Sequence, residues 1–353
     1  MGKTISVALI GNPNTGKSSV FNTLTGLKQA IGNYPGVTVE KKIGNFEIDR
    51  TTNVQLIDLP GTYGLNTQSI DQSIVFDLLL NKNNKDFPDL VVIVADVENL
   101  KRNLLLFSQI KDLEIPTILV INMSDQLRYK GIEINLNKLE IELKTKVVLV
   151  SARKNQGFEI LKSEIKNYRN LSNKPAFDMN EIDPEYFSNL QKTFSGQSVY
   201  KLWLLITQDI NFSKLERNKI DDKGKFKTQT ESYLKKLQQR ETIKRYQSIN
   251  NLLKEAYVKD DKKATGLRSV IDRVLLHSVW GYLIFFSILL LIFQVIFDWS
   301  SIPMDFIDST FVSLSQSVKS GLPQGVFTSL LAEGVIPGLA GILIFVPQIA
   351  LLF

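Results

Sequence analysis

Residues 11–18 have the composition and spacing of a loop that binds phosphate groups. Four residues separate Gly11 from Gly16, and Lys17 and Ser18 follow at once. The whole run is Gly11, Asn12, Pro13, Asn14, Thr15, Gly16, Lys17 and Ser18. The glycines let consecutive N–H groups turn toward a phosphate, and a helix that starts here adds the positive end of its dipole. We therefore predict a nucleoside triphosphate site in which Lys17 reaches the β- and γ-phosphates and Ser18 binds Mg²⁺.

A second motif, Asp58-Leu59-Pro60-Gly61, ends a strand-like run at 54–58. We expect the Asp58 carboxylate to lie near the magnesium ion and the N–H of Gly61 to lie near the γ-phosphate.

A third run supplies a hydroxyl on what we expect to be a mobile loop. Thr38 stands within Gly36-Val37-Thr38-Val39-Glu40. Its hydroxyl is predicted to bind Mg²⁺ and its backbone to contact the γ-phosphate. The alternative is a plain hairpin entry with Pro35-Gly36 as its turn.

Two later motifs fit a purine base. Asn122-Met123-Ser124-Asp125 follows the apolar run 116–121, and Val150-Ser151-Ala152 follows the apolar run that starts at Lys146. A carboxylate at Asp125 accepts hydrogen bonds from the N1–H and the exocyclic amine of guanine, whereas adenine would leave it unpaired. A backbone N–H at Ser151-Ala152 can meet the guanine O6, although that dipeptide alone is equally typical of an ordinary loop. Together these motifs predict GTP over ATP.

The residues after Gly61 are Thr62 and Tyr63, so no glutamine stands there to hold an attacking water. We expect slow intrinsic hydrolysis unless another group neutralises charge in the transition state. Asn14 is one candidate, because its side chain could help to hold a monovalent cation. A purely loop-shaping asparagine is the alternative. The predicted catalytic set is Lys17, Asn14, Thr38 and Gly61.

Elements that would position these motifs alternate along residues 1–170. The predicted strands are 5–10, 40–48, 54–58, 90–95, 116–121 and 146–150, and the predicted helices are 17–25, 69–81, 99–112, 134–143 and 157–168. This alternation predicts an α/β fold, an open sheet with helices on both faces. Together with the nucleotide motifs, the sheet resembles that of a Ras-like P-loop GTPase. Every motif then falls at the carboxyl ends of strands, where such sheets bind ligands.

The rest of the chain predicts a small helical domain and a membrane segment. Pro175 marks a linker, and residues 184–258 carry apolar side chains at helical spacing among many charged ones, with a loop at 211–224. Residues 279–297 contain no charge and, at about 1.5 Å per residue, cover about 28 Å, enough to cross a bilayer. Lysines and arginines precede this run and aspartates follow it, which places the N-terminal side in the cytoplasm.

A second apolar segment at 334–353 is interrupted by glycine and proline, as in broken helices that line a translocation path. Its apolar end suggests the front part of a longer membrane protein. The lack of a secretory signal suggests that the N-terminal half stays in the cytoplasm. The chain has no cysteine, which excludes disulfides and thiolate metal sites. Its net charge of +6 is interleaved with acidic residues, so we expect no nucleic acid partner.

The combined motifs resemble the FeoB family of bacterial ferrous-iron transporters. The resemblance rests on residues 11–18, 33–40, 58–63, 122–125 and 345–349. It implies a GTPase domain at 1–170, a helical spacer at 171–266 that tunes nucleotide affinity, and the start of a transmembrane domain at 267–353. It further implies GTP or GDP, Mg²⁺ and K⁺ as cofactors, with Asn14 at the position of the cation-contacting asparagine.

The same resemblance implies Fe²⁺ uptake across the inner membrane, with the lipid bilayer, a small cytoplasmic regulator of the same transport system and a homo-oligomer as partners. Whether hydrolysis drives or gates transport stays open. A soluble-type GTPase of ribosome or tRNA metabolism with a membrane anchor is the alternative, but 184–258 lacks the compact basic surface that RNA binding needs. A dynamin-type GTPase is disfavoured, because it would need long amphipathic stalk helices and residues 184–258 are predicted to form a single compact helical segment.

Overall fold

The computed structural model of the chain divides into two compact units, Met1–Gly266 and Leu267–Phe353. It describes residues 3–27, 29–33, 40–65, 74–75, 78–82, 84–207, 231–260 and 274–352, together with positions 263, 265 and 271. Most of the helix predicted at 69–81 and the loop predicted at 211–224 therefore lie outside the described residues.

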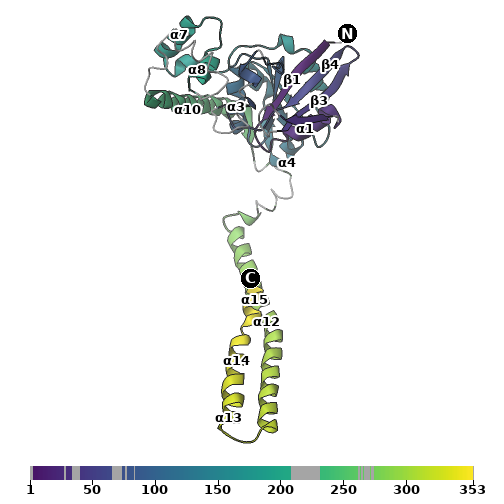
Figure 1. Cartoon of the computed structure of the whole chain (residues 1–353), viewed down its shortest axis with the longest axis vertical. Helices are drawn as coiled ribbons and strands as arrows, with labels where there is room; N and C mark the ends of the chain where they lie inside the picture. Colours follow the sequence, from purple (N-terminus) through teal and green to yellow (C-terminus); the bar gives the residue numbers. More distant parts are fainter. Residues whose placement is uncertain are drawn as a thin grey trace. The chain divides into compact units, whose positions relative to one another are not determined.

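The first unit is built on a seven-stranded sheet in the order β2-β3-β4-β1-β5-β6-β8 (Figure 1). Its strands are β1 (Lys3–Gly11), β2 (Gln29–Asn33), β3 (Glu40–Asp49), β4 (Thr52–Asp58), β5 (Leu90–Asp96), β6 (Thr117–Asn122) and β8 (Lys146–Leu149). Strands β4, β1, β5, β6 and β8 are parallel, whereas β2 and β3 run antiparallel at one edge. The predicted α/β sheet is confirmed. The edge strand β2 was not predicted, because Gln29–Asn33 is short and does not alternate.

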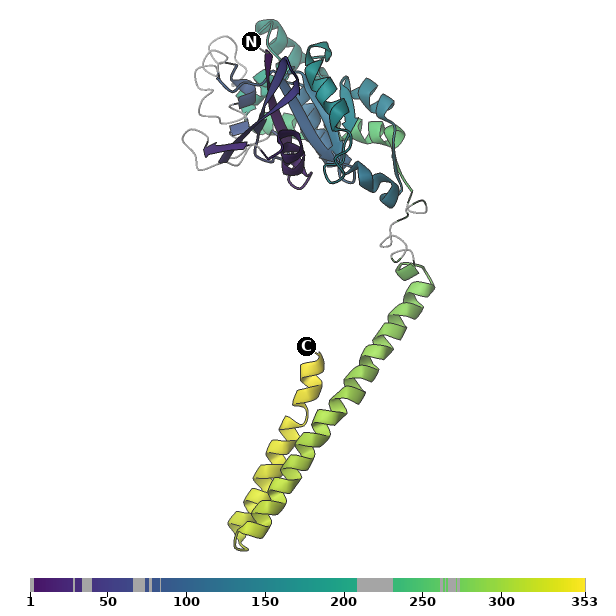
Figure 2. The ribbon, with the colours of Figure 1, turned by 90° about the vertical axis from the view of Figure 1, so that its right-hand side faces the viewer.

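Alternating side chains along β1 divide the core into two layers. Ile5, Val7 and Leu9 pack into one buried cluster, and Ala8 and Ile10 pack into the other. A strand that is buried on both faces reads as an apolar run, as β1 does from Ile5 to Ile10 apart from Ser6. The sheet is therefore the middle layer of a three-layer sandwich (Figure 2).

Helices cover both faces. On one side lie α1 (Lys17–Thr25) and α6 (Phe158–Lys166), which contribute Phe21 and Leu161 to one cluster. On the other lie α3 (Leu100–Lys111) and α5 (Leu136–Leu143), which contribute Phe107 and Leu139 to the other. Shorter helical turns follow β6 and α6: η1 (Ser124–Gln126) and α4 (Leu127–Lys130) after the strand, and η2 (Tyr168–Asn170) after the helix.

The helical part of this unit shares its core with the sheet. Its elements are η3 (Met179–Glu181), α7 (Pro184–Thr193), α8 (Val199–Thr207) and α10 (Glu231–Ala256). Phe187, Trp203 and Leu237 belong to the same buried cluster as Phe107 of α3. The residues predicted as a separate spacer therefore pack directly on the α3 side of the sheet (Figure 1).

A second, two-stranded sheet joins distant parts of the chain. Strand β7 (Ile132–Ile134) pairs antiparallel with β9 (Tyr257–Lys259), which follows α10 without an intervening residue. Neither three-residue strand was predicted, because such short segments carry no measurable period.

The second unit is a helical hairpin. Its elements are α12 (Trp280–Gly321), α13 (Val326–Ser329), the π-helical turn η5 (Leu330–Val335), α14 (Ile336–Leu343) and α15 (Val346–Leu352). The last four pack beside α12, where Ser315 donates a hydrogen bond of 2.7 Å to the carbonyl of Ala332 (Figure 2). Trp280–Gly321 and Val326–Ala350 are each long and apolar enough to cross a bilayer, judged by length and composition.

The helix α12 extends well beyond the apolar run predicted at 279–297. It contains 42 residues, or about 63 Å at about 1.5 Å per residue, which is twice the thickness of a hydrocarbon core. The prediction stopped where charged residues begin, yet Asp298 and Pro303 lie inside the helix. The second segment also starts earlier than its predicted position, 334–353, and its break lies at 344–345, before Pro347.

Candidate functional site

The sequence motifs gather at one edge of the seven-stranded sheet. The phosphate loop leaves β1, Asp58 ends β4, and Asn122 ends β6. These strands are parallel and either adjacent or separated by β5 alone, so their carboxyl ends meet at the same edge. Residues that are far apart in the sequence thereby form one site.

The phosphate loop is held in a conformation that glycine makes possible. Asn14 and Gly16 adopt positive φ angles of 67° and 78°. A Cβ atom added to Gly16 would lie 2.3 Å from Nδ2 of Asn122, so no larger residue fits there. Gly16, the residue at the N-cap of α1, has no side chain that could cap the helix. The backbone N–H groups of its first turn are therefore available to a phosphate.

Two opposite charges meet beside this loop. The Nζ atom of Lys17 forms an ion pair with Oδ1 of Asp58, and both side chains are nearly buried. Ser18, in the first turn of α1, is exposed. Asp58 and Ser18 offer the carboxylate and hydroxyl oxygens that Mg²⁺ prefers, and Lys17 offers a cation to phosphate oxygens. These residues fit a phosphate with its magnesium ion.

The segment after Asp58 packs on the phosphate loop. The N–H of Leu59 donates to the carbonyl of Leu9 at 2.9 Å, and the N–H of Thr62 donates to that of Gly11 at 3.2 Å. Between them, Gly61 is exposed and lies against Pro13. Residues 59–62 therefore contact the phosphate loop and the end of β1 directly.

Asn122 joins the phosphate loop to both predicted base motifs. Its Nδ2 donates to the carbonyl of Thr15 at 3.1 Å, and its Oδ1 accepts from the N–H of Ala152 at 3.1 Å. The hydroxyl of Ser151 donates to Oδ1 of Asp125 at 2.6 Å. Asp125 is thus oriented by a buried serine and keeps acceptor capacity for a ligand.

The same loops are fixed by their backbones. The N–H of Ser124 donates to the carbonyl of Val150 at 3.0 Å, and Met123 between Asn122 and Ser124 has a positive φ of 63°. Of the third predicted run, Gly36, Val37, Thr38 and Val39 lie outside the described residues, and Glu40 is the first residue of β3.

One residue of the phosphate loop is unusual. Asn12 is 3% exposed, and neither Oδ1 nor Nδ2 of its side chain has a hydrogen-bond partner within the described part of the chain. A buried amide without partners is destabilising. The sequence offered Asn12 only as a member of the motif and gave no sign of this burial.

Two contacts that the sequence analysis missed fasten residues 61–65 to α3. The guanidinium of Arg102 lies 3.9 Å from the ring centroid of Tyr63, and Oε1 of Gln109 accepts a hydrogen bond of 2.8 Å from the N–H of Leu65. Both partners stand on α3, so the segment that follows Asp58 is docked on this helix. Neither Arg102 nor Gln109 belongs to a recognisable sequence motif.

A buried charge cluster then fastens α3 to α10. Arg245 has no exposed side-chain surface; it contacts Oδ2 of Asp112 at 2.6 Å, Oε1 of Glu241 at 2.8 Å and the hydroxyl of Ser108 at 3.1 Å. The Nε1–H of Trp203 donates to the other oxygen of Glu241 at 2.9 Å. The cluster therefore ties α3, α8 and α10 together.

Burial and charge act in opposite directions within the cluster. Burial raises the pKa of Asp112, although the guanidinium of Arg245 opposes this. For Arg245, burial disfavours the charged form, but Asp112 and Glu241 outweigh it and raise its pKa above the ordinary value. The guanidinium of Arg245 is therefore charged at any physiological pH.

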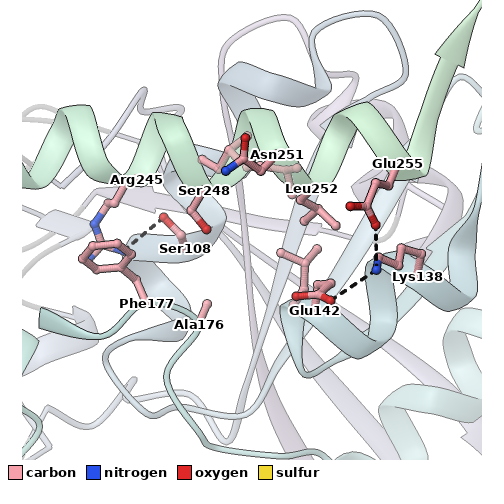
Figure 3. A pocket seen from close by; sticks show the side chains of 13 residues that line it. Ser108, Lys138, Glu142, Ala176, Phe177, Arg245, Ser248, Asn251, Leu252 and Glu255 are labelled. Carbon is pink, nitrogen blue, oxygen red and sulfur yellow. Dashed lines mark hydrogen bonds and ion pairs between the residues drawn. The ribbon is translucent and has the colours of Figure 1, made fainter. Parts of the chain in front are cut away.

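A groove runs from this cluster along α10. Figure 3 shows Arg245, Ser108 and Phe177 at one end and the ion pairs of Lys138 with Glu142 and Glu255 at the other. Its walls come from α3, α5 and α10, and the ion pairs at 3.5 and 2.8 Å are exposed. The groove lies away from the phosphate loop.

Comparison with known proteins gives a consistent result. A family model described as ferrous iron transport protein B matches residues 5–165. The chain is 33% identical over 365 residues to the Fe(2+) transporter FeoB of Leptospira biflexa, covering 99% of this chain and 52% of that protein. It is 34% identical over 364 residues to FeoB of Staphylococcus aureus, covering 98% of this chain and 54% of that protein. The chain thus spans about half the length of these curated relatives.

Solved structures agree with the fold. The cytosolic domain of the T. maritima FeoB iron transporter in a GDP form matches 72% of this chain and 100% of that chain, with a TM-score of 0.64 and 31% identity. The same domain in its GMPPNP form gives a TM-score of 0.63 and 32% identity, again over 72% of this chain and 100% of that chain.

Proposed function

Because the chain belongs to the FeoB family, we propose that its first unit binds GTP, hydrolyses it slowly to GDP, and thereby controls passage of Fe²⁺ through a membrane domain whose first part is residues 267–353. In this proposal residues 1–170 are the GTPase domain and residues 171–266 are a spacer that tunes nucleotide affinity. The T. maritima domain carries GDP or GMPPNP in its structures, which supports guanine nucleotides as the ligands.

The observation that carries the proposal is the position of Asn122. This one side chain bonds to Thr15 of the phosphate loop and to Ala152 of the base loop, at 3.1 Å each. Phosphate and base sites are therefore held at a fixed separation, as one nucleotide requires. Asp125, aligned by Ser151, supplies the guanine-specific acceptor.

The chemistry assigned to each residue follows from its place. Ser18 and Asp58, with Thr38, would hold Mg²⁺, which neutralises phosphate charge when bound. Lys17 leaves its ion pair with Asp58 to contact phosphate oxygens. The exposed N–H of Gly61 donates to the γ-phosphate. Thr62 and Tyr63 provide no amide side chain to orient water, so hydrolysis by this chain is slow.

Asn14 is the residue we assign to potassium stimulation. It is exposed within the phosphate loop, where its side-chain oxygen can join phosphate oxygens around a monovalent cation. Asn14→Ala should retain GTP but lose the increase in hydrolysis rate when K⁺ replaces Na⁺. An Asn14→Ala protein that is still stimulated by K⁺ would exclude this role.

The two long apolar helices support a location in the bacterial inner membrane, and the lysines and arginines before the first apolar run support a cytoplasmic first unit. A small cytoplasmic regulator and a homo-oligomer are further partners in this proposal.

The test combines nucleotide binding with iron uptake. Lys17→Ala should abolish GTP binding, because the phosphate loop loses its only positive side chain, and cells that carry it in the full-length protein should lose Fe²⁺ uptake. Lys166→Ala is the matched control, since Lys166 pairs with Asp49 at 2.9 Å, away from the motifs. Uptake that persists in Lys17→Ala cells would refute nucleotide control of transport.

A further inference from the structure

The small β7–β9 sheet connects the guanine motif to the chain that enters the membrane unit. Ile132 pairs with Lys259, Glu133 with Val258, and Ile134 with Tyr257. A backbone hydrogen bond lies at each end of the ladder. The N–H of Asp260 donates to the carbonyl of Gly131 at 2.9 Å, and the N–H of Asn135 donates to the carbonyl of Ala256 at 2.8 Å. The contact is thus one continuous antiparallel ribbon.

One strand of this ribbon continues directly from the base motif. Asp125 lies in η1, which runs into α4 and then, after Gly131 alone, into β7. The connection between β7 and Asp125, the carboxylate that selects guanine, is therefore short. A displacement of β7 must therefore shift or strain the helical turns that hold Asp125.

The other strand is the last described strand before the membrane unit. β9 continues α10 without a break, and the chain reaches Leu267, the first residue of the second unit, within a few residues of Lys259. Of the helices and strands described in the first unit, β9 is therefore the one nearest to the second unit along the chain.

The ribbon is also the kind of element that opens easily. It has only three residue pairs; Glu133 and Val258 are exposed, and the ion pair of Lys263 with Glu133, 2.9 Å long, is exposed on both sides. Short exposed strands and exposed ion pairs contribute little to stability. By contrast, Ala256 before β9 is 1% exposed, so the end of α10 stays anchored when the strand detaches.

We propose that β9 is a detachable strap through which the membrane unit controls release of guanine nucleotide. With β9 paired, α4 and η1 are held and Asp125 retains the base; when movement in the membrane unit removes β9, the base loop loosens and the nucleotide leaves. Because coupling between two sites is reciprocal, nucleotide binding also favours the paired strap and biases the membrane unit. This inference rests on the proposed guanine site.

The absence of cysteine from the chain permits a direct test. Glu133→Cys with Val258→Cys places two thiols at directly opposed, exposed positions, where Cα atoms lie about 4.5–5.5 Å apart and a disulfide can form. The matched control is Glu47→Cys with Asn53→Cys, an exposed opposed pair on β3 and β4. The chain is placed in nanodiscs, loaded with fluorescent GDP, and chased with unlabelled GDP before and after oxidation.

Oxidation of the Glu133→Cys, Val258→Cys protein (the strap pair) should slow GDP release about five- to tenfold, within the range typical of coupled sites. Reduction of the disulfide should restore the original rate. The control pair should release GDP at one rate in both redox states. Conversely, Val258→Pro, which cannot donate to the ladder, should accelerate release.

If the oxidised and reduced forms of the strap pair both bind GDP and release it at the same rate, the proposed role of β9 is overturned and the proposed function still stands. A Val258→Pro protein that releases GDP at the unmodified rate would overturn the proposed role of β9 as well. Failure of the reduced protein to bind GDP at all would overturn the proposed function itself, and the strap with it.

Discussion

Replacing Arg245 by methionine should detach α10 from α3 and cost much of the stability of the first unit. Arg245 is wholly buried and contacts Asp112, Glu241 and Ser108 between 2.6 and 3.1 Å. Methionine fills a similar volume without any polar group. The change therefore removes charge while the packing volume is nearly kept.

The magnitude follows from the two carboxylates that stay behind. Asp112 and Glu241 are each 1% exposed. Breaking a buried ion pair by removing one partner typically costs about 3–5 kcal/mol, because the other charge is left in the interior. Asp112 retains the N–H groups of Ala176 and Phe177 at 2.7 and 3.1 Å, which compensate part of its cost. We expect a loss of about 4 kcal/mol.

Trp203 reports on this cluster. It is fully buried, and its indole donates to Glu241 at 2.9 Å. The other two tryptophans, Trp280 and Trp299, are exposed on α12, so Trp280→Phe with Trp299→Phe leaves Trp203 as the single reporter. In urea titrations followed by its fluorescence, Arg245→Met should lower the midpoint by about 1–2 M.

A control separates charge from packing. Adding Asp112→Asn and Glu241→Gln to Arg245→Met removes the stranded charges and should recover about half of the lost stability, since neutral buried groups cost less than ions. A loss below about 1 kcal/mol in Arg245→Met would refute the reasoning, because it would mean that the cluster is not desolvated. So would a triple variant that is less stable than the single one.

Three further outcomes test other parts of the structure. Asp125→Asn should weaken GTP binding about 30-fold or more, since charge-assisted hydrogen bonds are worth about 1.5–3 kcal/mol each, and should favour xanthosine nucleotides in competition assays; unchanged guanine preference would exclude the assignment. Burial lowers the pKa of Lys111 to about 8. The unfolded lysine therefore binds more protons between about pH 8 and 10.5, and the contribution of Lys111 to stability rises with pH across that window; Lys111→Met should flatten the slope in urea titrations at several pH values. Finally, Ser320→Cys at the far end of α12 should react with an impermeant maleimide in intact cells, whereas Ser287→Cys in the apolar run should not; protection of both positions would contradict an α12 that extends beyond the bilayer.

The sequence predicted most of the sheet because its strands are buried on both faces. Runs such as Ile5 to Ile10, apart from Ser6, and Leu90 to Ala95 are apolar and separated by helical patterns, so local composition and spacing suffice. The phosphate loop was predictable for a related reason: its glycines and Lys17 are required by backbone geometry and charge within a few residues.

Short elements and buried polar contacts were not predictable. Three-residue strands such as β7 and β9 have no period, and each is defined only by its partner about 125 residues away. Glu241 and Arg245 read as an ordinary exposed i,i+4 pair on a charged helix. Their burial depends on α8 and α3 covering the same face of α10.

The sequence alone determined which chemistry to expect of the chain: short motifs whose residue types fit phosphate, magnesium and a guanine base, and an uncharged run long enough for a bilayer. Only the tertiary structure decided how these parts are joined. Asn122 between two loops, Arg245 beneath α3 and β9 across β7 are all contacts between distant segments, and their free energy depends on burial and approach that no local pattern specifies.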